Sequence, residues 1–181
     1  MALKATIFRA ALQIADMERN YYHDHSLTLA RHPSETDERM MVRLLAFALN
    51  AHEALVFGPG IGGDEEPDLW QKDLTGAIRL WIDVGLPDEK RVRRACGRAD
   101  RVIVYGYGRG ADLWWKQSAE KLARSENLEV VDLPQVVTQG LARLAKRNMQ
   151  LNCTIQDGQV WLADENESVE IHARSRTAIT R

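Results

Sequence analysis

Two aspartates in the middle of the chain have the type and spacing of a metal-binding pair. Asp68 follows Pro67, and Asp83 closes an apolar run that leads to Gly85. Carboxylate oxygens are the ligands that Mg²⁺ takes in proteins, where the ion usually keeps several waters beside one or two such groups. A bound divalent metal lowers the pKa of its water and neutralises charge at phosphorus. The pair therefore predicts phosphodiester hydrolysis, with Mg²⁺ or Mn²⁺ as the cofactor.

Glu38 is the third candidate ligand, and a predicted helix would carry it. Ser34 with Asp37 is typical of a capping box, so a helix is expected to start here. At about 100° per residue, Glu38 falls on the apolar stripe of this helix, while Arg39 and Arg43 are expected to point away. Two interpretations stay open. Glu38 is a buried metal ligand, or it is an acid that the helix dipole favours in a first turn.

A lysine is the remaining catalytic group, because its ammonium orients the attacking water or stabilises the transition state. Many metal-dependent nucleases place this lysine two residues after the second acid, and Gly85 occupies that position here. Lys72 and Lys90 are the candidate replacements. Lys72 is expected on the same face of the hairpin as Asp68 and Asp83. Lys90 starts the next helix, and on the helical wheel it points away from the apolar stripe.

A β-hairpin must bring the two aspartates together. The segments "PDLWQK" and "AIRLWIDVG" alternate on either side of the turn "DLTG". With the turn centred on its Leu-Thr pair, Asp68 lies opposite Trp81 and diagonal to Asp83, roughly 5–7 Å away. We expect this face to point away from the core. Arg79 shares the face, so a structural ion pair with Arg79 is the alternative to a metal.

The rest of the pattern is typical of an α/β protein. Alternating or apolar strands are predicted near both ends of the chain, at 4–16, 21–31, 159–163 and 169–174. Asp157-Gly158 is a strong hairpin turn. Between the ends, strands alternate with helices, which predicts a central mixed sheet flanked by helices with right-handed crossovers. We therefore expect one domain over 1–181, with an additional β-hairpin from each terminal region.

Composition narrows the class of function. The net charge of −2 and the pI of about 6.2 argue against avid, sequence-blind binding to nucleic acid, which depends on phosphate neutralisation. A basic cluster at 90–101 remains, and its simplest interpretation is a solvated helix face. No apolar stretch reaches the length of a membrane span, so no membrane partner is expected. The two cysteines lack metal-ligand spacing, and with no signal peptide they favour the cytoplasm.

Two other motifs suggest different sites. The turn at 106–111 has the spacing of a dinucleotide-binding fingerprint, and Asp132 follows at the distance of a ribose-binding acid. Too few strands follow for such a fold, so a tight strand-to-helix turn is favoured. His23 and His25 share one face of a strand and would need a third ligand to hold a metal. Two such histidines are more often plain polar or packed side chains.

The chain resembles the YaeQ family of small bacterial proteins along essentially its whole length. The resemblance is strongest in "DHSLTLARHPSETDERMMVRLLAFALNA" and "EPDLWQKDLTGAIRLWIDVGLPDEKRVRRACGRADRVIVYGYG". It implies a variation on the PD-(D/E)xK nuclease-like core, in which a helix with an acid precedes a hairpin with two acidic motifs. By position, Asp68 is the Pro-Asp acid, Asp83 the (D/E)xK acid and Glu38 the helix acid.

Two functions from different classes follow. The first is a Mg²⁺-dependent nuclease-like enzyme that acts on nucleic acid through Asp68, Asp83 and Glu38. The second is a catalytically inactive module of the same fold that binds a protein or a nucleic acid in a regulatory role. Gly85 and the acidic pI favour the second. The family's association with transcription elongation has no motif in this sequence.

Overall fold

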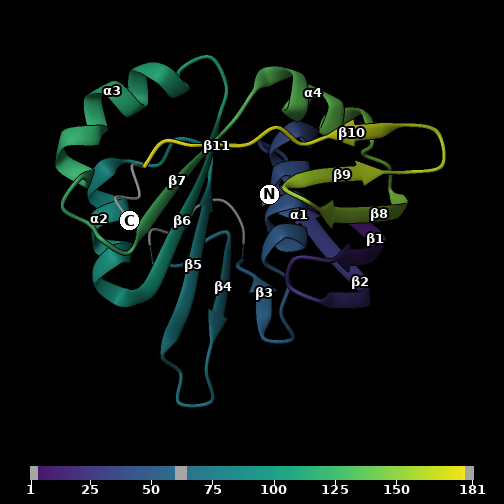
Figure 1. Ribbon diagram of the computed structural model, residues 1–181, viewed down its shortest axis with the longest axis horizontal. Helices are drawn as coiled ribbons and strands as arrows, with labels where there is room; N and C mark the ends of the chain where they lie inside the picture. The colour runs from purple at the N-terminus through teal and green to yellow at the C-terminus, as the bar shows by residue number, and fades with distance from the viewer. Residues whose placement is uncertain (1–3, 60–64, 178–181) are drawn as a thin grey trace. The chain divides into compact units, whose positions relative to one another are not determined.

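The computed structural model describes residues 4–59 and 65–177. The segment "FGPGIGGDEE" at 57–66, whose glycines predict a loop, lies partly outside them. The described residues form two mixed sheets and four helices, which confirms the mixed α/β class (Figure 1). The chain divides into two compact units. Unit 1 comprises Met1–Ala48 and Val136–His172, and unit 2 comprises Leu49–Gln135 and Ala173–Arg181. The single nuclease-like domain over 1–181 stays a prediction.

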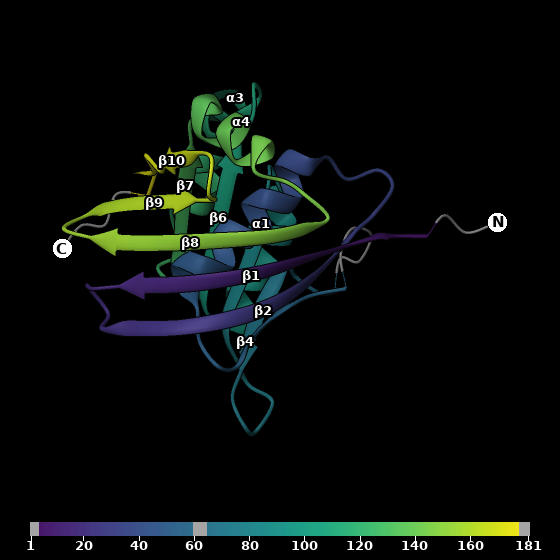
Figure 2. The same cartoon turned by 90° about the vertical axis from the view of Figure 1, so that its right-hand side faces the viewer.

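Unit 1 contains a five-stranded sheet made from both ends of the chain. Its strand order is β10 (Ser168–Glu170), β9 (Gln159–Ala163), β8 (Asn148–Gln156), β1 (Thr6–Asp16) and β2 (Tyr21–Arg31). The two predicted terminal hairpins are confirmed, and Asp157 and Gly158 turn the second with φ values of 53° and 77°. β1 and β8 pair in parallel and so join the hairpins into one sheet, which the sequence did not predict (Figure 2).

Helix α1 (Asp37–Asn50) contributes the apolar layer against this sheet. All residues from Met40 to Ala48 are buried, so the helix is covered on every side through its middle. The ring of Phe47 packs edge-on against that of His25 on β2, with centroids 5.1 Å apart. The predicted cap was wrong by two residues. Thr36 accepts the Arg39 N–H through its hydroxyl at 3.1 Å.

Unit 2 contains a six-stranded sheet in which three strands are parallel. The order is β11 (Arg174–Ser175), β7 (Leu128–Leu133), β6 (Ala99–Tyr107), β5 (Ile78–Val84), β4 (Leu69–Lys72) and β3 (Leu55–Phe57). Helices α2 (Glu89–Arg98) and α3 (Ala111–Leu122) make the crossovers between the parallel strands, and α4 (Gln135–Arg143) follows β7. The predicted stripe of α2 is confirmed, because Val92 and Ala95 pack with Trp81 in the core.

The predicted register of the β4–β5 hairpin was wrong by two residues. Trp70 pairs with Trp81 and Leu69 with Ile82, and a bulge interrupts the ladder between Gln71 and Lys72. Beyond the bulge, a shift of two keeps Trp70, Trp81 and Asp83 on their predicted face, because the side-chain period of a strand is two. Continued by one residue, the observed register places Asp68 opposite Asp83, rather than diagonal to it.

The prediction that this face points away from the core was also wrong. Trp81 is 1% exposed and lies in a cluster with α2 residues. The reason is that β5 pairs in parallel with β6, and the crossover helix α2 covers the face that carries Trp81 and Asp83. Parallel strands are usually buried on both faces, whereas the sequence prediction treated the hairpin as a half-exposed antiparallel pair.

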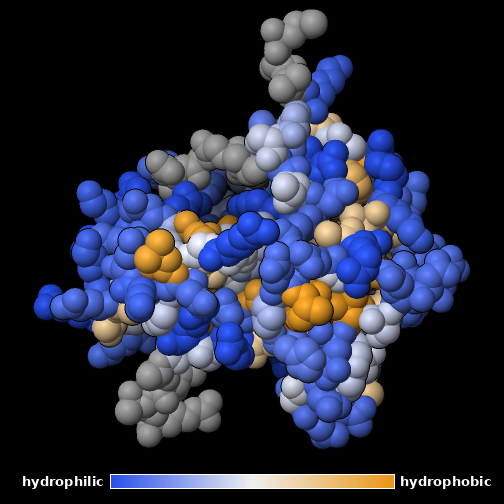
Figure 3. Space-filling model, turned by 90° about the horizontal axis from the view of Figure 1, so that it is seen from above, coloured by the Kyte–Doolittle hydropathy of each residue, from blue (hydrophilic) through white to orange (hydrophobic). Residues whose placement is uncertain are grey.

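The surface is mainly polar. Hydrophilic residues cover most of the face drawn in Figure 3, and hydrophobic residues appear there as a few separate groups. Within the described part of the chain, no helix is long and apolar enough to cross a bilayer. Neither cysteine forms a disulfide: Cys153 is buried and Cys96 half-buried. Burial is the largest cause that raises the pKa of both thiols, that of Cys153 to about 12.

Candidate carboxylate site of unit 2

Asp68 is positioned by its own backbone and by the end of β5. The Gly58 N–H donates to the Asp68 carbonyl at 2.8 Å, and a Cβ at Gly58 would lie 1.9 Å from the Pro67 carbonyl oxygen. Only glycine therefore permits this close approach. The Asp68 carboxylate accepts the Val84 N–H at 2.8 Å through Oδ2. Asp68 is only 7% exposed, so its side chain takes part in closing the hairpin end.

Asp83 is held by an arginine from the next helix. The Arg91 Nε donates to Asp83 Oδ2 at 2.9 Å, and its Nη2 donates to Oδ1 at 3.1 Å. The same Nη2 donates to the Glu66 carbonyl at 3.0 Å. The Asp83 side chain is 3% exposed and that of Arg91 is 18% exposed. A two-pronged guanidinium–carboxylate pair of this kind is among the stronger charge-assisted contacts in proteins.

Arg91 supplies the positive charge that the sequence analysis assigned to a metal. A Mg²⁺ ion needs oxygen ligands in near-octahedral geometry, and both Asp83 oxygens here accept from Arg91. The arrangement as it stands does not fit a bound Mg²⁺, because the ion would have to displace Arg91 from Asp83. Within residues 4–59 and 65–177, no group of three or more His, Cys, Asp or Glu side chains is arranged to hold a metal ion.

The arginine alternative named from the sequence was the wrong residue. Arg79 forms ion pairs with Asp73 and Asp100, each at 2.7 Å. The side chain of Arg79 is 54% exposed, so these pairs lie at the surface of the hairpin. The bulge beside Lys72 is the physical reason, because it interrupts the regular alternation that would have placed Arg79 on the face of Asp83.

Neither candidate lysine is seen in contact with the carboxylates. The Lys72 ammonium lies over the ring of Trp70, 3.8 Å from the centroid. Lys90 is exposed in the first turn of α2, and its backbone N–H donates to the Asp88 cap at 2.7 Å. The catalytic roles of both lysines stay predictions. The contacts described above are with residues close to each lysine in the chain.

Gly85 has a backbone conformation that disfavours the lysine of the nuclease pattern. Its φ is +101°, in the region that side chains with a Cβ rarely adopt. Its N–H donates to the Tyr105 carbonyl at 2.9 Å, which fixes the chain as it leaves β5. The space around a Cβ at Gly85 is open, so backbone strain rather than a clash accounts for the glycine.

Glu38 belongs to unit 1, whereas Asp68 and Asp83 belong to unit 2. Glu38 is half-buried in the first turn of α1. Its convergence with the two aspartates and its role as a metal ligand stay predictions. Arg43, which was predicted to point away from the apolar stripe, is nevertheless buried, with 2% of it exposed.

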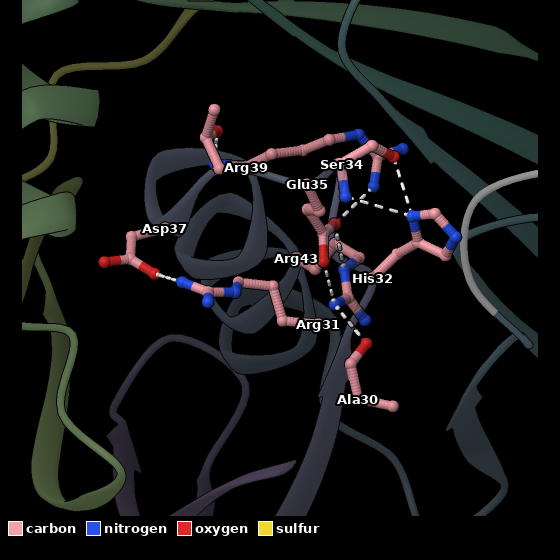
Figure 4. A network of polar contacts seen from close by, with 9 residues as sticks. Ala30, Arg31, His32, Ser34, Glu35, Asp37, Arg39 and Arg43 are labelled. Atoms are coloured by element: carbon pink, nitrogen blue, oxygen red, sulfur yellow. Dashed lines mark hydrogen bonds and ion pairs between the residues drawn. The ribbon is translucent and has the colours of Figure 1, made fainter. Parts of the chain in front are cut away.

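The buried acid at this helix start is Glu35 (Figure 4). Arg43 donates to both Glu35 oxygens, at 2.9 and 2.6 Å, and Arg39 adds a third contact at 2.6 Å. Arg43 also donates to the Ala30 carbonyl on β2 at 3.1 Å. Removing one partner of such a buried pair typically costs roughly 3–5 kcal/mol. The network therefore fixes α1 to the sheet of unit 1. Asp37 pairs with Arg31 beside it.

The turn at 106–111 and the histidine pair of β2 both make contacts within the protein. Gly108 turns the chain between β6 and α3 with φ of +96°, and Asp132 pairs with Arg176 at 2.8 Å. The 106–111 segment is thus the tight turn that the sequence favoured. On β2, the Tyr21 hydroxyl and the His25 Nε2 lie 2.8 Å apart, and burial is the main cause that lowers the pKa of His25.

Neither Arg91 as the partner of Asp83 nor Glu35 as the buried acid beside α1 was predicted from the sequence. The helical pattern of α2 did indicate a buried position for Arg91. It lies one helical turn before Ala95, on the α2 stripe that faces β5. A buried cation was therefore predictable once α2 was known to cover the face of Asp83. Glu35 precedes the helix, so helical periodicity gave it no signal.

Comparison with known proteins places the whole chain in one family. The YaeQ protein family model matches residues 1–173. Proteins named "Uncharacterized protein YaeQ" from Salmonella typhi and Escherichia coli K12 are each 46% identical, over 94% and 95% of this chain and 95% and 96% of theirs.

Two crystal structures of YaeQ proteins are also similar. The protein from Xanthomonas axonopodis pv. citri has a TM-score of 0.92 at 52% identity, covering 96% of this chain and 99% of that one. The protein from Pseudomonas syringae has a TM-score of 0.91 at 34% identity, covering 96% of both chains. The family model, the relatives and these two structures thus lead to one conclusion: the chain belongs to the YaeQ family.

Proposed function

We propose that this protein is a nuclease-like module that binds nucleic acid without cleaving it. The observation that carries the proposal is the two-pronged contact between Arg91 and Asp83, at 2.9 and 3.1 Å. A guanidinium in this position neutralises the carboxylate, but unlike a metal ion it brings no bound water of lowered pKa. The positive φ of Gly85 works in the same direction, because it disfavours the catalytic lysine.

The order of elements in the chain supports the nuclease-like part of the proposal. Helix α1 is followed by the antiparallel strands β3, β4 and β5, then by α2 and the parallel strand β6. The resemblance implies this arrangement, a helix with an acid before a hairpin that carries two acidic motifs. Asp68 and Asp83 stand at the corresponding ends of β4 and β5.

Helix α2 supports the nucleic-acid part of the proposal. Lys90 and Arg94 are both exposed on it. Among the contacts between described residues, neither charged group forms a hydrogen bond or an ion pair. Cations that are not neutralised within the protein are the ones that can release counterions from a phosphate backbone. Because the net charge is −2, binding depends on this local surface, and the affinity falls as the salt concentration rises.

A Mg²⁺-dependent nuclease is the second candidate. Two carboxylates that are 7% and 2% exposed at adjacent strand ends favour it, because buried acids are expensive unless they serve a structure or a reaction. Asp68, Asp83 and Glu38 are its ligands, with Lys72 or Lys90 as the positioning group. For this candidate, Arg91 would have to release Asp83 before the carboxylates could hold a Mg²⁺ ion, which would supply a bound water of lowered pKa.

Binding and cleavage of labelled oligonucleotides separate the two candidates. We expect fluorescence anisotropy to detect binding of single-stranded or duplex DNA or RNA in EDTA at low salt. The same oligonucleotides should remain intact after incubation with Mg²⁺ or Mn²⁺. The variant Lys90→Gln/Arg94→Gln should weaken binding and lower the salt dependence of log K by about 1 for each cation lost.

The matched control removes two exposed cations from and just after α3. Lys116→Gln/Arg124→Gln changes the net charge equally, and we expect it to bind like the unmodified chain. Cleavage that needs Mg²⁺ and disappears in Asp68→Asn would establish the second candidate instead. Absence of binding to every oligonucleotide would reject the nucleic-acid part of the proposal.

A further inference from the structure

A small pocket between α2 and the β4–β5 hairpin has a basic rim. It encloses about 40 Å³ and is lined by Glu65, Trp81, Arg91, Arg94, Ala95 and Arg98. Three of these residues are arginines that repeat at helical spacing on one face of α2. Ala95 lies among them, and its short side chain and the Trp81 side chain also line the pocket. The pocket is therefore a consequence of the helix sequence, with one small residue inside a row of arginines.

Trp81, which lines the pocket, carries a hydrogen-bond donor without an acceptor among the described residues. Trp81 is 1% exposed, and its indole N–H has no partner among the described residues. Nearly all buried N–H groups in proteins are paired, so an orphan donor beside a pocket indicates an acceptor that is not among the described residues. Trp114 provides the contrast. Its indole N–H donates to the Pro87 carbonyl at 2.7 Å.

The charge around this donor selects an anion. The guanidinium carbon of Arg98 lies 5.1 Å from the centre of the Trp81 ring, and that of Arg91 lies 5.9 Å away. Arg91 is committed to Asp83 and Arg98 donates to the Glu65 carbonyl at 2.9 Å. The guanidinium of Arg94 forms no hydrogen bond or ion pair with any described residue. It is therefore the arginine left to bind a ligand.

The volume limits what enters the pocket. About 40 Å³ has room for a water molecule or for one oxygen of a larger group, because a cavity needs only about 10–15 Å³ to hold a water. A phosphate group presents single oxygens on a tetrahedral centre. One oxygen can accept the Trp81 N–H while another accepts from Arg94 at the rim. A planar guanidinium suits this geometry, because it offers several donors in a fixed fork.

We propose that this pocket, here called the Trp81 pocket, binds one oxygen of a phosphate group. The inference rests on the proposed nucleic-acid function in one respect: under that function, the phosphate belongs to the backbone of a nucleic-acid strand. A free phosphate or pyrophosphate supplies the same chemistry, and the experiment below compares the two sources.

The test follows the indole N–H resonances by NMR during titration with sodium pyrophosphate. Trp81→Phe removes the N–H and keeps an aromatic ring, so it assigns the Trp81 signal. Triple-resonance assignment replaces it if that variant does not fold. We expect the Trp81 signal to move with saturation, whereas the Trp114 signal stays in place. Sodium chloride at the same ionic strength should move neither signal.

Two substitutions on the same helix complete the test. Arg94→Gln should weaken pyrophosphate binding about tenfold, the usual effect of losing one charge-assisted hydrogen bond. Arg93→Gln is the matched control, because Arg93 is the neighbouring residue, pairs with Glu89 and does not line the pocket. A Trp81 signal that ignores pyrophosphate, or that chloride moves equally, would overturn the proposal and leave water as the acceptor.

A labelled oligonucleotide distinguishes failure of this inference from failure of the proposed function. If pyrophosphate binds and no oligonucleotide does, the Trp81 pocket stands as a site for a small phosphate compound. If oligonucleotides bind and Trp81 does not respond to them or to pyrophosphate, the inference fails while the proposed function stands. A Trp81 signal that moves with both ligands supports both.

Discussion

At the scale of single residues, the candidate site depends on a glycine and an arginine. Gly85 leaves β5 with φ of +101°, and Arg91 spans both oxygens of Asp83. Each disagrees with a metal-dependent nuclease in a different way. The glycine excludes an unstrained lysine, and the arginine takes the position of the cation. Their agreement is the reason to propose a nuclease-like module without nuclease activity.

Restoring the lysine of the nuclease pattern should therefore destabilise the protein. Gly85→Lys forces a side chain into the positive-φ region, which costs roughly 1–3 kcal/mol in the free energy of unfolding. Gly97→Lys is the control. Gly97 lies within α2 with open space around it, so the same change there should stabilise the helix by roughly 0.5 kcal/mol. Urea denaturation measures both, and a Gly85→Lys variant as stable as the unmodified chain would contradict the argument.

Residue types predicted part of this site. Pro67-Asp68 and Asp83 were found from the sequence because carboxylates beside a predicted hairpin are a recognisable chemical pattern. The partner of Asp83 was not found. Choosing Arg91 over Arg79 requires knowing which helix covers the strand, and that is a property of tertiary packing.

At the scale of elements, the β4–β5 turn sets the register that places the aspartates. The Asp73 carboxylate accepts the Thr75 N–H at 2.9 Å, the Thr75 hydroxyl at 2.6 Å and the Ala77 N–H at 3.0 Å. Gly76 completes the turn with φ of +87°. This side-chain cap makes the turn longer than the loop assumed from "DLTG". The register of the hairpin therefore differs by two residues from the predicted one, because the sequence pattern does not indicate the length of the turn.

The pKa of Asp73 tests the cap. The Thr75 hydroxyl is the largest cause that lowers this pKa from 3.8 to about 2, with the Ala77 and Thr75 N–H groups and Arg79 adding to it. A lowered pKa in the folded state stabilises the turn above pH 3.8, and this contribution is lost as the pH falls through about 2.

Thr75→Val removes the hydroxyl and should raise the pKa of Asp73, as measured by carboxyl ¹³C shifts during a pH titration. Thr75→Ser keeps a hydroxyl and is the control that should preserve the low value. An Asp73 that titrates at its ordinary pKa in the unmodified protein would contradict the proposed cap.

At the scale of the whole molecule, the chain combines two units with different kinds of sheet. Unit 1 joins hairpins from opposite ends of the sequence through the parallel pairing of β1 and β8. Unit 2 contains the carboxylate site and the Trp81 pocket. The hairpins and the mixed α/β class were predictable because alternation is a local signal. The β1–β8 pairing was not, because it joins segments that only the tertiary fold brings together.

The central claim is that Arg91, and not a metal ion, balances the buried carboxylates of unit 2. Isothermal titration calorimetry with Mg²⁺ tests it on the unmodified protein, Arg91→Gln and the charge-preserving control Arg91→Lys. We predict no Mg²⁺ binding at millimolar concentration by the unmodified chain or Arg91→Lys, and measurable binding by Arg91→Gln, whose Asp83 lacks a countercharge. Stoichiometric Mg²⁺ binding by the unmodified protein that disappears in Asp83→Asn would contradict the claim.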